Sequence, residues 1–256
     1  MNLNNRITLF VKLGRFFDAF IKKKLDHNEL NKFKKAINES IIHNSFFNER
    51  NILKSLTAWS NVLTKKSINS FLSNYLIENK KTERKVAVIM AGNVPMVGFH
   101  DFFCVIISGN FAKIKLSSKD SHLFKFILGY LESINPDFSM KFEIIEKKLT
   151  EFDAVIATGN NISANQFDSY FKNYPKIIRR NRHSIAILDG NESENEIQLL
   201  ANDIFYYYGL GCRNISKIYI PLNYNLDKLF NSFISWKEVI NKNSYANNYD
   251  YYRAIY

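Results

Sequence analysis

The hydrophobic pattern of the chain changes character near residue 80. In the first 80 residues, apolar side chains recur every three or four positions, which places them on one face of a helix. The first such stripe contains Ile7, Phe10, Val11, Phe17, Phe20 and Ile21. Further stripes follow Asp26 and Asn48, and a fourth covers residues 68–76. We therefore predict four helices, of which the first is amphipathic and either lies on a membrane surface or, as is more common, docks on its own domain.

After a polar break at 78–83, short apolar runs alternate with helical spacing. The runs predict strands at 85–91, 112–116, 142–145, 153–157, 184–188 and 217–220. Helices are predicted at 96–108, 121–134, 164–173 and 193–208, and Ser193 and Glu196 have the spacing of a capping box. Apolar strands that alternate with helices are typical of a parallel sheet covered by helices. The sequence therefore predicts an α/β fold.

Polar residues follow three of the predicted strands. In parallel sheets, ligands bind at the carboxyl ends of the strands. A lysine and a helix N-terminus at that edge are able to face phosphate. The standard G-x-G-x-x-G fingerprint is absent, so dinucleotide binding does not follow from that motif. The residues expected at this edge are Gly92, Asn93, Lys115, Ser118, Thr158, Gly159 and Asn160.

A second candidate site lies at 206–214, where a tyrosine-rich helix end runs into Gly209, Gly211, Cys212 and Arg213. The two glycines let the backbone bend sharply and approach a ligand, and a thiol beside a cation is biased toward the nucleophilic thiolate. Cysteine is also a common core residue, and Gly-x-Gly after a helix is first of all a cap and a turn. The motif alone leaves both interpretations open.

The composition of the chain limits the classes of protein to which it can belong. The 256 residues are 46% hydrophobic, which fits a globular chain with a sizeable core. Cys104 and Cys212 have neither disulfide nor metal-site spacing, so we expect a cytoplasmic protein without a metal site. The net charge of +11 is spread along the chain, which favours a solvated surface over nucleic-acid binding. No apolar run is long enough for stable membrane insertion.

Four segments, taken in order, carry a resemblance to a known family. They are Gly-Asn-Val-Pro at 92–95, Ser-Gly-Asn at 108–110 followed by Lys113 and Lys115, Ala-Thr-Gly-Asn at 157–160, and Gly-Leu-Gly-Cys-Arg-Asn at 209–214. From about residue 45 onward, the chain resembles the aldehyde dehydrogenase superfamily and, more closely, the LuxC-type acyl-CoA reductases. The resemblance implies an aldehyde-dehydrogenase-like fold with a parallel Rossmann-type sheet. Its parts would be a helical N-terminal region (1–80), a dinucleotide-binding domain (81–190) and the start of a second α/β, catalytic domain (191–256).

The resemblance also implies an activity, the reduction of a fatty acyl thioester such as acyl-CoA to an aldehyde. Cys212 matches the family nucleophile, and Asn93 matches the asparagine whose amide, with the backbone N–H of the cysteine, forms the oxyanion hole. A thiolate exchanges readily with a thioester, and fixed N–H donors stabilise the charge that develops on oxygen. The alternative interpretation is that Asn93 has no catalytic role and is a structural asparagine of the turn.

Two departures from the family pattern refine the expected chemistry. The stretch 179–184 has no glutamate at the place where hydrolytic aldehyde dehydrogenases carry their general base, which favours thioester chemistry. Ser118 stands where NAD-dependent members have a glutamate, so a 2′-phosphate would fit beside Lys115, and we expect NADPH as cofactor. The alternative interpretation is that Ser117 and Ser118 only cap the next helix and do not bind the cofactor.

The aldehyde dehydrogenase pattern needs a longer catalytic domain after Cys212, so we expect this chain to be an N-terminal portion of a longer protein. The competing interpretation is a non-catalytic nucleotide-binding or interaction module, a truncated pseudoenzyme in which Cys212 is only a packed thiol. The resemblance leaves open whether the protein is a homo-oligomer.

Overall fold

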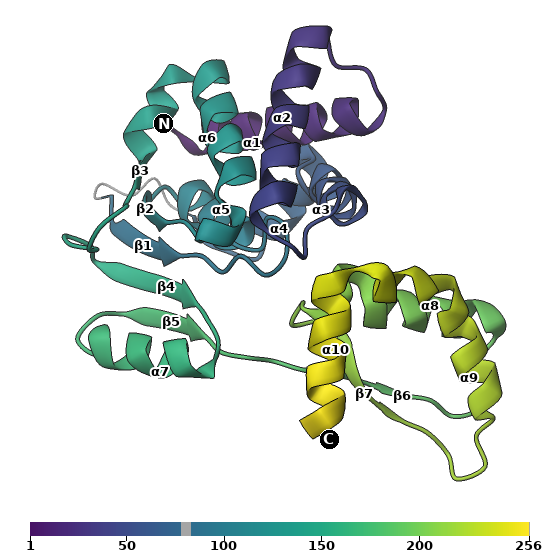
Figure 1. Cartoon of the computed structure of the whole chain (residues 1–256). Helices are drawn as coiled ribbons and strands as arrows, with labels where there is room; N and C mark the ends of the chain where they lie inside the picture. Colours follow the sequence, from purple (N-terminus) through teal and green to yellow (C-terminus); the bar gives the residue numbers. More distant parts are fainter. Residues whose placement is uncertain (78–82, 256) are drawn as a thin grey trace. The chain divides into compact units, whose positions relative to one another are not determined.

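The computed structural model describes residues 1–77 and 83–255. Of the polar break predicted at 78–83, only Glu83 lies within the described residues. The chain divides into two units, Met1–Arg180 and Asn181–Tyr256 (Figure 1). The first unit therefore contains the N-terminal helices together with the larger sheet.

Four N-terminal helices form where the hydrophobic stripes predict them, except that the fourth ends at Leu72 and leaves Leu76, the last residue of its stripe, exposed outside the helix. They are α1 (Leu3–Ile21), α2 (His27–His43), α3 (Glu49–Val62) and α4 (Lys65–Leu72). Each begins after a polar N-cap whose side chain accepts a hydrogen bond from a backbone N–H of the first turn. The stripe of α1 is buried, and Phe10 packs against Phe99 and Phe103 in edge-on contacts. The helix α1 thus packs against the rest of the first unit, as the more common of the two predicted alternatives requires.

The first unit contains a five-stranded parallel sheet with the order β3-β2-β1-β4-β5. Its strands are β1 (Lys85–Ile89), β2 (Phe111–Lys115), β3 (Phe142–Ile144), β4 (Ala154–Thr158) and β5 (Lys176–Arg179). The parallel sheet and the α/β class are as predicted. The sequence analysis missed β5 because this edge strand has only two apolar residues between charged ends.

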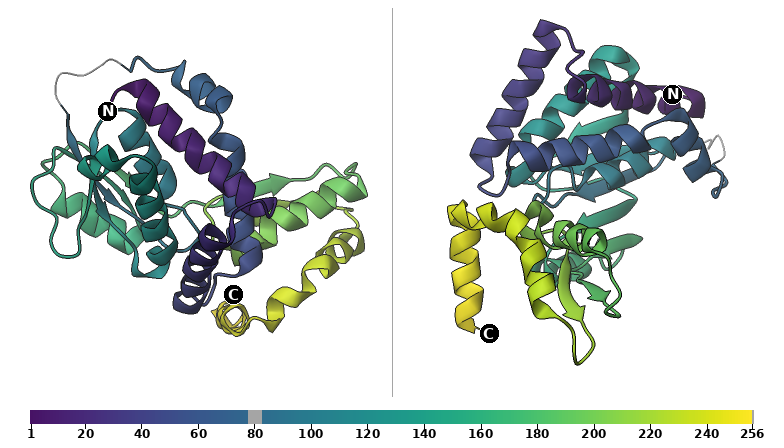
Figure 2. Two further views of the ribbon diagram at one scale, coloured as in Figure 1. Left: turned by 90° about the horizontal axis from the view of Figure 1, so that it is seen from above. Right: turned by 90° about the vertical axis from the view of Figure 1, so that its right-hand side faces the viewer.

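The helices that connect the strands lie on opposite faces of the sheet (Figures 1 and 2). One face packs Val88 and Ile114 into the main core with α5 (Phe99–Ile107) and α6 (His122–Ile134). The other face packs Ala87 and Val155 against side chains of α7 (Asn161–Tyr170). The connections thus leave β1 and β4 toward opposite sides, which makes the gap between these two strands the topological switch point.

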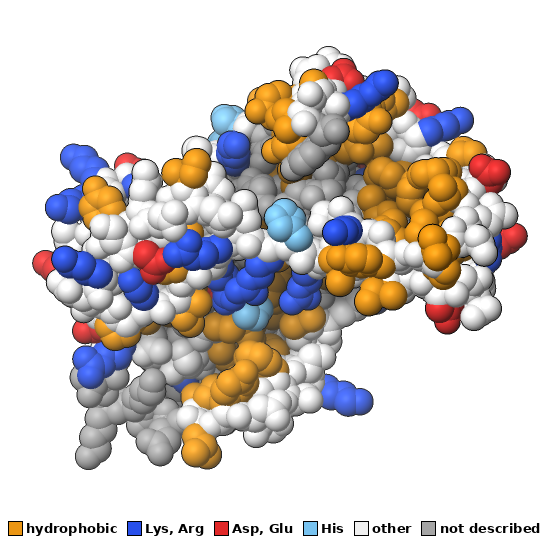
Figure 3. All heavy atoms as spheres, turned by 90° about the horizontal axis from the view of Figure 1, so that it is seen from below, with side chains coloured by type: hydrophobic (Ala, Val, Ile, Leu, Met, Phe, Trp, Pro, Cys, Tyr) orange, Lys and Arg blue, Asp and Glu red, His pale blue; other side chains and the backbone are white. Residues whose placement is uncertain are grey.

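The second unit has a small parallel sheet of β6 (Ser184–Ile187) and β7 (Ile215–Tyr219). The connecting helix α8 (Glu194–Phe205) starts with the predicted capping box of Ser193 and Glu196. After β7 come α9 (Leu226–Phe233), the 3₁₀ segment η4 (Ile234–Asn241) and α10 (Asn243–Ile255). Hydrophobic side chains are exposed in both units, and Figure 3 shows several groups of them on the face that it draws.

Candidate functional site

The register of the sheet brings three of the predicted site segments to one edge. Ile89 at the end of β1 is level with Lys115 of β2 on one side and with Ala157 of β4 on the other. The segments after these strands therefore leave the sheet at the same edge, beside the switch point. They carry Gly92 and Asn93, Ser118, and Thr158 to Asn160.

Gly92 lies where the loops after β1 and β2 touch. Its α-carbon is so close to the second loop that an added Cβ would lie 2.8 Å from the Cβ of Ser117. Asn44, which follows α2, donates from Nδ2 to the Gly92 carbonyl at 2.9 Å and to the Lys119 carbonyl at 3.2 Å. Glycine is therefore required at position 92 by close approach, and one buried amide fixes both loops.

The loop that carries Asn93 is held from several sides. Asn93 itself is exposed. The hydroxyl of Ser55 in α3 donates to the Pro95 carbonyl at 3.1 Å, and the Met96 N–H donates to Asp120 Oδ2 at 2.8 Å. Met96 has a φ of 60°, which is uncommon for a residue other than glycine. The loop is thus fixed in an unusual backbone conformation.

Lys115 and Ser118 lie at the same edge of the sheet, but the Lys115 side chain is hydrogen-bonded within the protein whereas Ser118 is exposed. The Lys115 ammonium donates to the backbone carbonyls of Glu146 and Lys147, the latter at 2.8 Å. Ser118 is exposed and begins the short 3₁₀ helix η1 (Ser118–Asp120). The capping role predicted for these serines belongs to Ser117, whose Oγ accepts a hydrogen bond from the Lys119 N–H at 3.2 Å.

The segment from Thr158 to Asn160 leads from β4 into α7. Asn160 caps this helix, because its Oδ1 accepts from the Ser163 N–H at 2.8 Å. Gly159 packs so closely on the helix that an added Cβ would lie 2.9 Å from the Cβ of Ser163. The N-terminus of α7, which is the positive end of the helix dipole, therefore lies at the carboxyl edge, where it can bind an anionic group.

The turn that carries Cys212 follows an abrupt end of α8. We predicted a helix as far as residue 208, and this prediction is wrong for its last residues, since α8 ends at Phe205. Tyr207, Tyr208 and Gly209 all have left-handed φ values, between 55° and 70°. Three successive left-handed residues cannot continue a right-handed helix.

Asn214 accounts for this helix end. Its buried side chain donates to the Asp203 carbonyl at 2.7 Å and to the Tyr206 carbonyl at 2.9 Å, and its Oδ1 accepts from the Gly211 N–H at 2.8 Å. One amide therefore supplies the partners that carbonyl groups at the end of a helix need, and it also fixes the turn before Cys212.

Cys212 is exposed, so its thiol is accessible to a substrate. Exposure argues against the interpretation of Cys212 as a packed core thiol. Cys212 belongs to the second unit and Asn93 to the first. A joint site formed by these two residues stays a prediction.

Sequence reasoning missed a cluster of charged residues on α5. Arg179 at the end of β5 donates to the buried Asp101 from Nη2 at 2.7 Å and from Nε at 3.3 Å. His100 Nδ1 lies 3.5 Å from Asp101 Oδ1, and the Cys104 sulfur lies 3.8 Å from His100 Nε2. The hydrogen bond to Asp101, followed by that to Cys104, raises the pKa of His100 to about 9. The spacing of His100 and Cys104 by four residues on a helix is the only local signal of this cluster.

Residues 179–182 contain three arginines, Arg179, Arg180 and Arg182, and this basic block is partly neutralised by carboxylates. Arg179 pairs with Asp101, and Arg180 pairs with Asp168 of α7. Two of its cations are therefore engaged by carboxylates.

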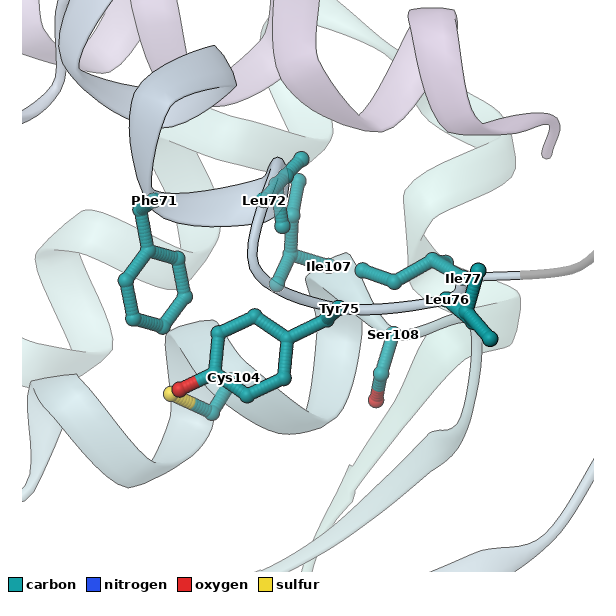
Figure 4. A pocket seen from close by; sticks show the side chains of 8 residues that line it. All are labelled: Phe71, Leu72, Tyr75, Leu76, Ile77, Cys104, Ile107 and Ser108. Carbon is teal, nitrogen blue, oxygen red and sulfur yellow. The ribbon is translucent and has the colours of Figure 1, made fainter.

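An apolar cavity of about 330 Å³ lies between α4 and α5 (Figure 4). Its described lining contains none of the predicted site residues. The lining consists of Phe71, Leu72, Tyr75, Leu76, Ile77, Cys104, Ile107 and Ser108. Within residues 1–77 and 83–255, no group of His, Cys, Asp and Glu side chains is arranged to hold a metal ion. In the same ranges no helix has the length and hydrophobicity to span a membrane.

Comparison with protein families identifies the chain. A family model described as acyl-CoA reductase (LuxC) matches residues 70–227, which include both Asn93 and Cys212. The chain therefore belongs to the LuxC acyl-CoA reductase family, as the resemblance indicates. A search of curated proteins finds no match.

Solved structures of aldehyde dehydrogenases have the same fold. Aldehyde dehydrogenase 21 from Physcomitrella patens, in complex with succinate, is 13% identical with a TM-score of 0.70, over 92% of this chain and 52% of that one. An NAD-dependent benzaldehyde dehydrogenase from Corynebacterium glutamicum is 13% identical with a TM-score of 0.67, over 92% and 54%. Glyceraldehyde-3-phosphate dehydrogenase GapN from Methanocaldococcus jannaschii, complexed with NADP, is 12% identical with a TM-score of 0.66, over 93% and 55%. The chain thus has an aldehyde-dehydrogenase-like fold and spans about half the length of these proteins.

Proposed function

We propose that this chain carries the cofactor-binding part and the nucleophile of an NADPH-dependent acyl-CoA reductase, which converts a long-chain fatty acyl thioester to an aldehyde. The observation that carries the proposal is the family match, because it spans Asn93, the strand ends and Cys212. The exposed position of Cys212 supports a nucleophilic role.

In this proposal, the Cys212 thiolate attacks the carbonyl carbon of acyl-CoA. A new carbon–sulfur bond forms, the bond to coenzyme A breaks, and the coenzyme A thiolate leaves. The amide of Asn93 and the backbone N–H of Cys212 donate hydrogen bonds to the carbonyl oxygen while it is negatively charged. When bound, NADPH supplies the hydride that reduces the acyl group to the aldehyde.

The residues proposed to hold NADPH are those at the carboxyl edge of the first sheet. Gly92 lets the loop after β1 pack against Ser117 at this edge, and the segment Thr158–Gly159–Asn160 carries the N-terminus of α7, which would face phosphate. Lys115 provides positive charge, and Ser118 provides a hydroxyl in place of a carboxylate. This set of donors fits a phosphorylated dinucleotide.

Two further expectations belong to the proposal. The two cysteines are free, which fits a reducing cytoplasm. Residues 179–184, from the end of β5 to the start of β6, contain no carboxylate to activate water, so the acyl group on Cys212 would be released by reduction or by a thiol.

Substitution of Asn93 tests the proposed oxyanion hole. Asn93→Ala should slow acyl transfer from acyl-CoA to Cys212 by about 100- to 1000-fold. Asn173→Ala, an exposed asparagine in the same unit, serves as the matched control and should leave the rate unchanged. A less stable Asn93→Ala protein with a normal rate per folded molecule would instead identify Asn93 as a structural turn residue.

A further inference from the structure

The loop that carries Asn93 depends on a buried carboxyl group from another part of the chain. We propose that Asp120 is a positioning residue, whose carboxyl holds the Met96 amide and thereby fixes the conformation of residues 92–96. Its consequence for catalysis rests on the function proposed above, in which Asn93 stabilises the oxyanion.

The geometry of the contact supports this role. Asp120 is only 6% exposed, and its Oδ2 accepts a hydrogen bond of 2.8 Å from the Met96 N–H. Met96 ends the loop with a φ of 60°, a left-handed conformation that is unfavourable for a side chain with a Cβ. A residue in such a conformation persists only where its surroundings hold it there, and the bond from the Met96 amide to Asp120 does so directly.

The other anchors of the loop act at different positions. Asn44 binds the carbonyl of Gly92, and Ser55 binds the carbonyl of Pro95. Both anchors donate to carbonyl groups, whereas Asp120 accepts from an N–H group. Asn44 and Ser55 therefore cannot replace Asp120 as the acceptor for the Met96 amide, so the strained end of the loop depends on Asp120.

The second oxygen of Asp120 suits a neutral acid better than a carboxylate. Asp120 Oδ1 is buried and has no hydrogen-bond partner among the described residues. Burial raises the pKa of Asp120 to about 8, against the opposing effect of the Met96 N–H. Asp120 is therefore mainly protonated at pH 7. A carboxyl exposed to water ionises near 3.8, so any opening that exposes Asp120 becomes easier as the pH rises from about 4 to about 8, and the native loop loses stability over that range.

Several other ionisable groups lie in the segments that surround Asp120. They are Lys119 in η1, Glu39 and His43 in α2, and His122 at the start of α6. His122 Nδ1 lies 3.2 Å from Glu39 Oε2, and the rings of His43 and His122 are 4.1 Å apart. The substitution Asp120→Asn separates the effect of Asp120 from theirs, because it removes only the one titrating group and keeps an oxygen that can accept from Met96.

Hydrogen exchange of the Met96 amide tests the proposal without reference to activity. We expect Asp120→Ala to lower the protection factor of this amide at pH 7 by tenfold or more, whereas Asp120→Asn should retain it. In the wild type the protection factor should fall as the pH rises from about 4 to about 8 and level off above 8, and Asp120→Asn should abolish that fall. Asp137→Ala, an exposed carboxylate of the same unit, is the control and should have no effect.

Unchanged Met96 protection in Asp120→Ala would overturn the proposal. If Asp120→Ala does not fold, the comparison of wild type with Asp120→Asn decides the proposal, since equal pH profiles of Met96 protection between about pH 4 and pH 8 would also contradict it. The rate of acyl transfer to Cys212 gives the catalytic consequence, a roughly tenfold loss in Asp120→Ala at an unchanged KM. Absence of acyl transfer in the wild type would contradict the proposed function but not the positioning of the loop, which hydrogen exchange measures by itself.

Discussion

The side-chain amide of Asn214 donates a hydrogen bond to the Asp203 carbonyl at 2.7 Å and so connects the end of α8 to the turn that carries Cys212. The same side chain accepts from the Gly211 N–H, one residue before the cysteine. The position of the proposed nucleophile thus depends on a buried asparagine two residues after it.

Asn214→Ala should destabilise the second unit. The substitution leaves backbone groups at the end of α8 and at Gly211 without their partner, and such a loss costs about 1–3 kcal/mol. Denaturant unfolding, followed by the fluorescence of Trp236 in a Trp59→Phe background, measures the change. Asn223→Ala, an exposed residue of the same unit, should stay within about 0.5 kcal/mol of the wild type. Equal stability of the two variants would show that the Asn214 contacts contribute little.

A methyl group at position 92 should disturb the proposed cofactor edge. In Gly92→Ala the new Cβ would overlap with Ser117, so the two loops must separate, at a cost of about 1–3 kcal/mol. We expect a lower thermal midpoint and weaker NADPH binding. Gly129→Ala is the matched control, because a Cβ at this position in α6 meets no atom within 4 Å and alanine favours the helix. A Gly92→Ala variant as stable as Gly129→Ala would mean that the loops adapt freely.

The choice between NADPH and NADH is predicted to depend on Ser118. Ser118→Glu would bring a carboxylate near the 2′-phosphate, and the repulsion should weaken NADPH binding tenfold or more and reverse the preference. Both dissociation constants should be measured for the wild type and the variant. Ser139→Glu, at an exposed serine of the 3₁₀ helix η2 (Pro136–Lys141), controls for the added charge. If the wild type binds both cofactors equally and Ser118→Glu changes neither constant, Ser118 has no part in cofactor selection.

Local sequence signals were sufficient for most of the helices and strands. The stripe of α1, the capping box of Ser193 and Glu196 and the apolar run of β1 each depend on residues close together in the chain. The edge strand β5 lacked such a signal, because an edge strand needs few apolar residues. The end of α8 was also missed, since it depends on Asn214, which lies beyond the helix.

The sequence indicated which residues lie at the carboxyl edge but not what holds them there. Asn44 contacts Gly92 across 48 positions of sequence, and Arg179 contacts Asp101 across 78. Neither contact has a local pattern that would reveal it. The local sequence around Asp120 gives no signal of its burial, and only the fold shows that it is buried and bonded to the loop of Asn93.

Acylation followed by peptide mapping shows whether Cys212 accepts the acyl group of acyl-CoA. The protein is incubated with an acyl-CoA labelled in its acyl chain, without NADPH, so that the acyl group is not reduced. We expect label on the peptide that contains Cys212, its loss in Cys212→Ala, and an unchanged yield in Cys104→Ala. Label that persists in Cys212→Ala, or a wild-type protein that takes up no label, would contradict this role of Cys212.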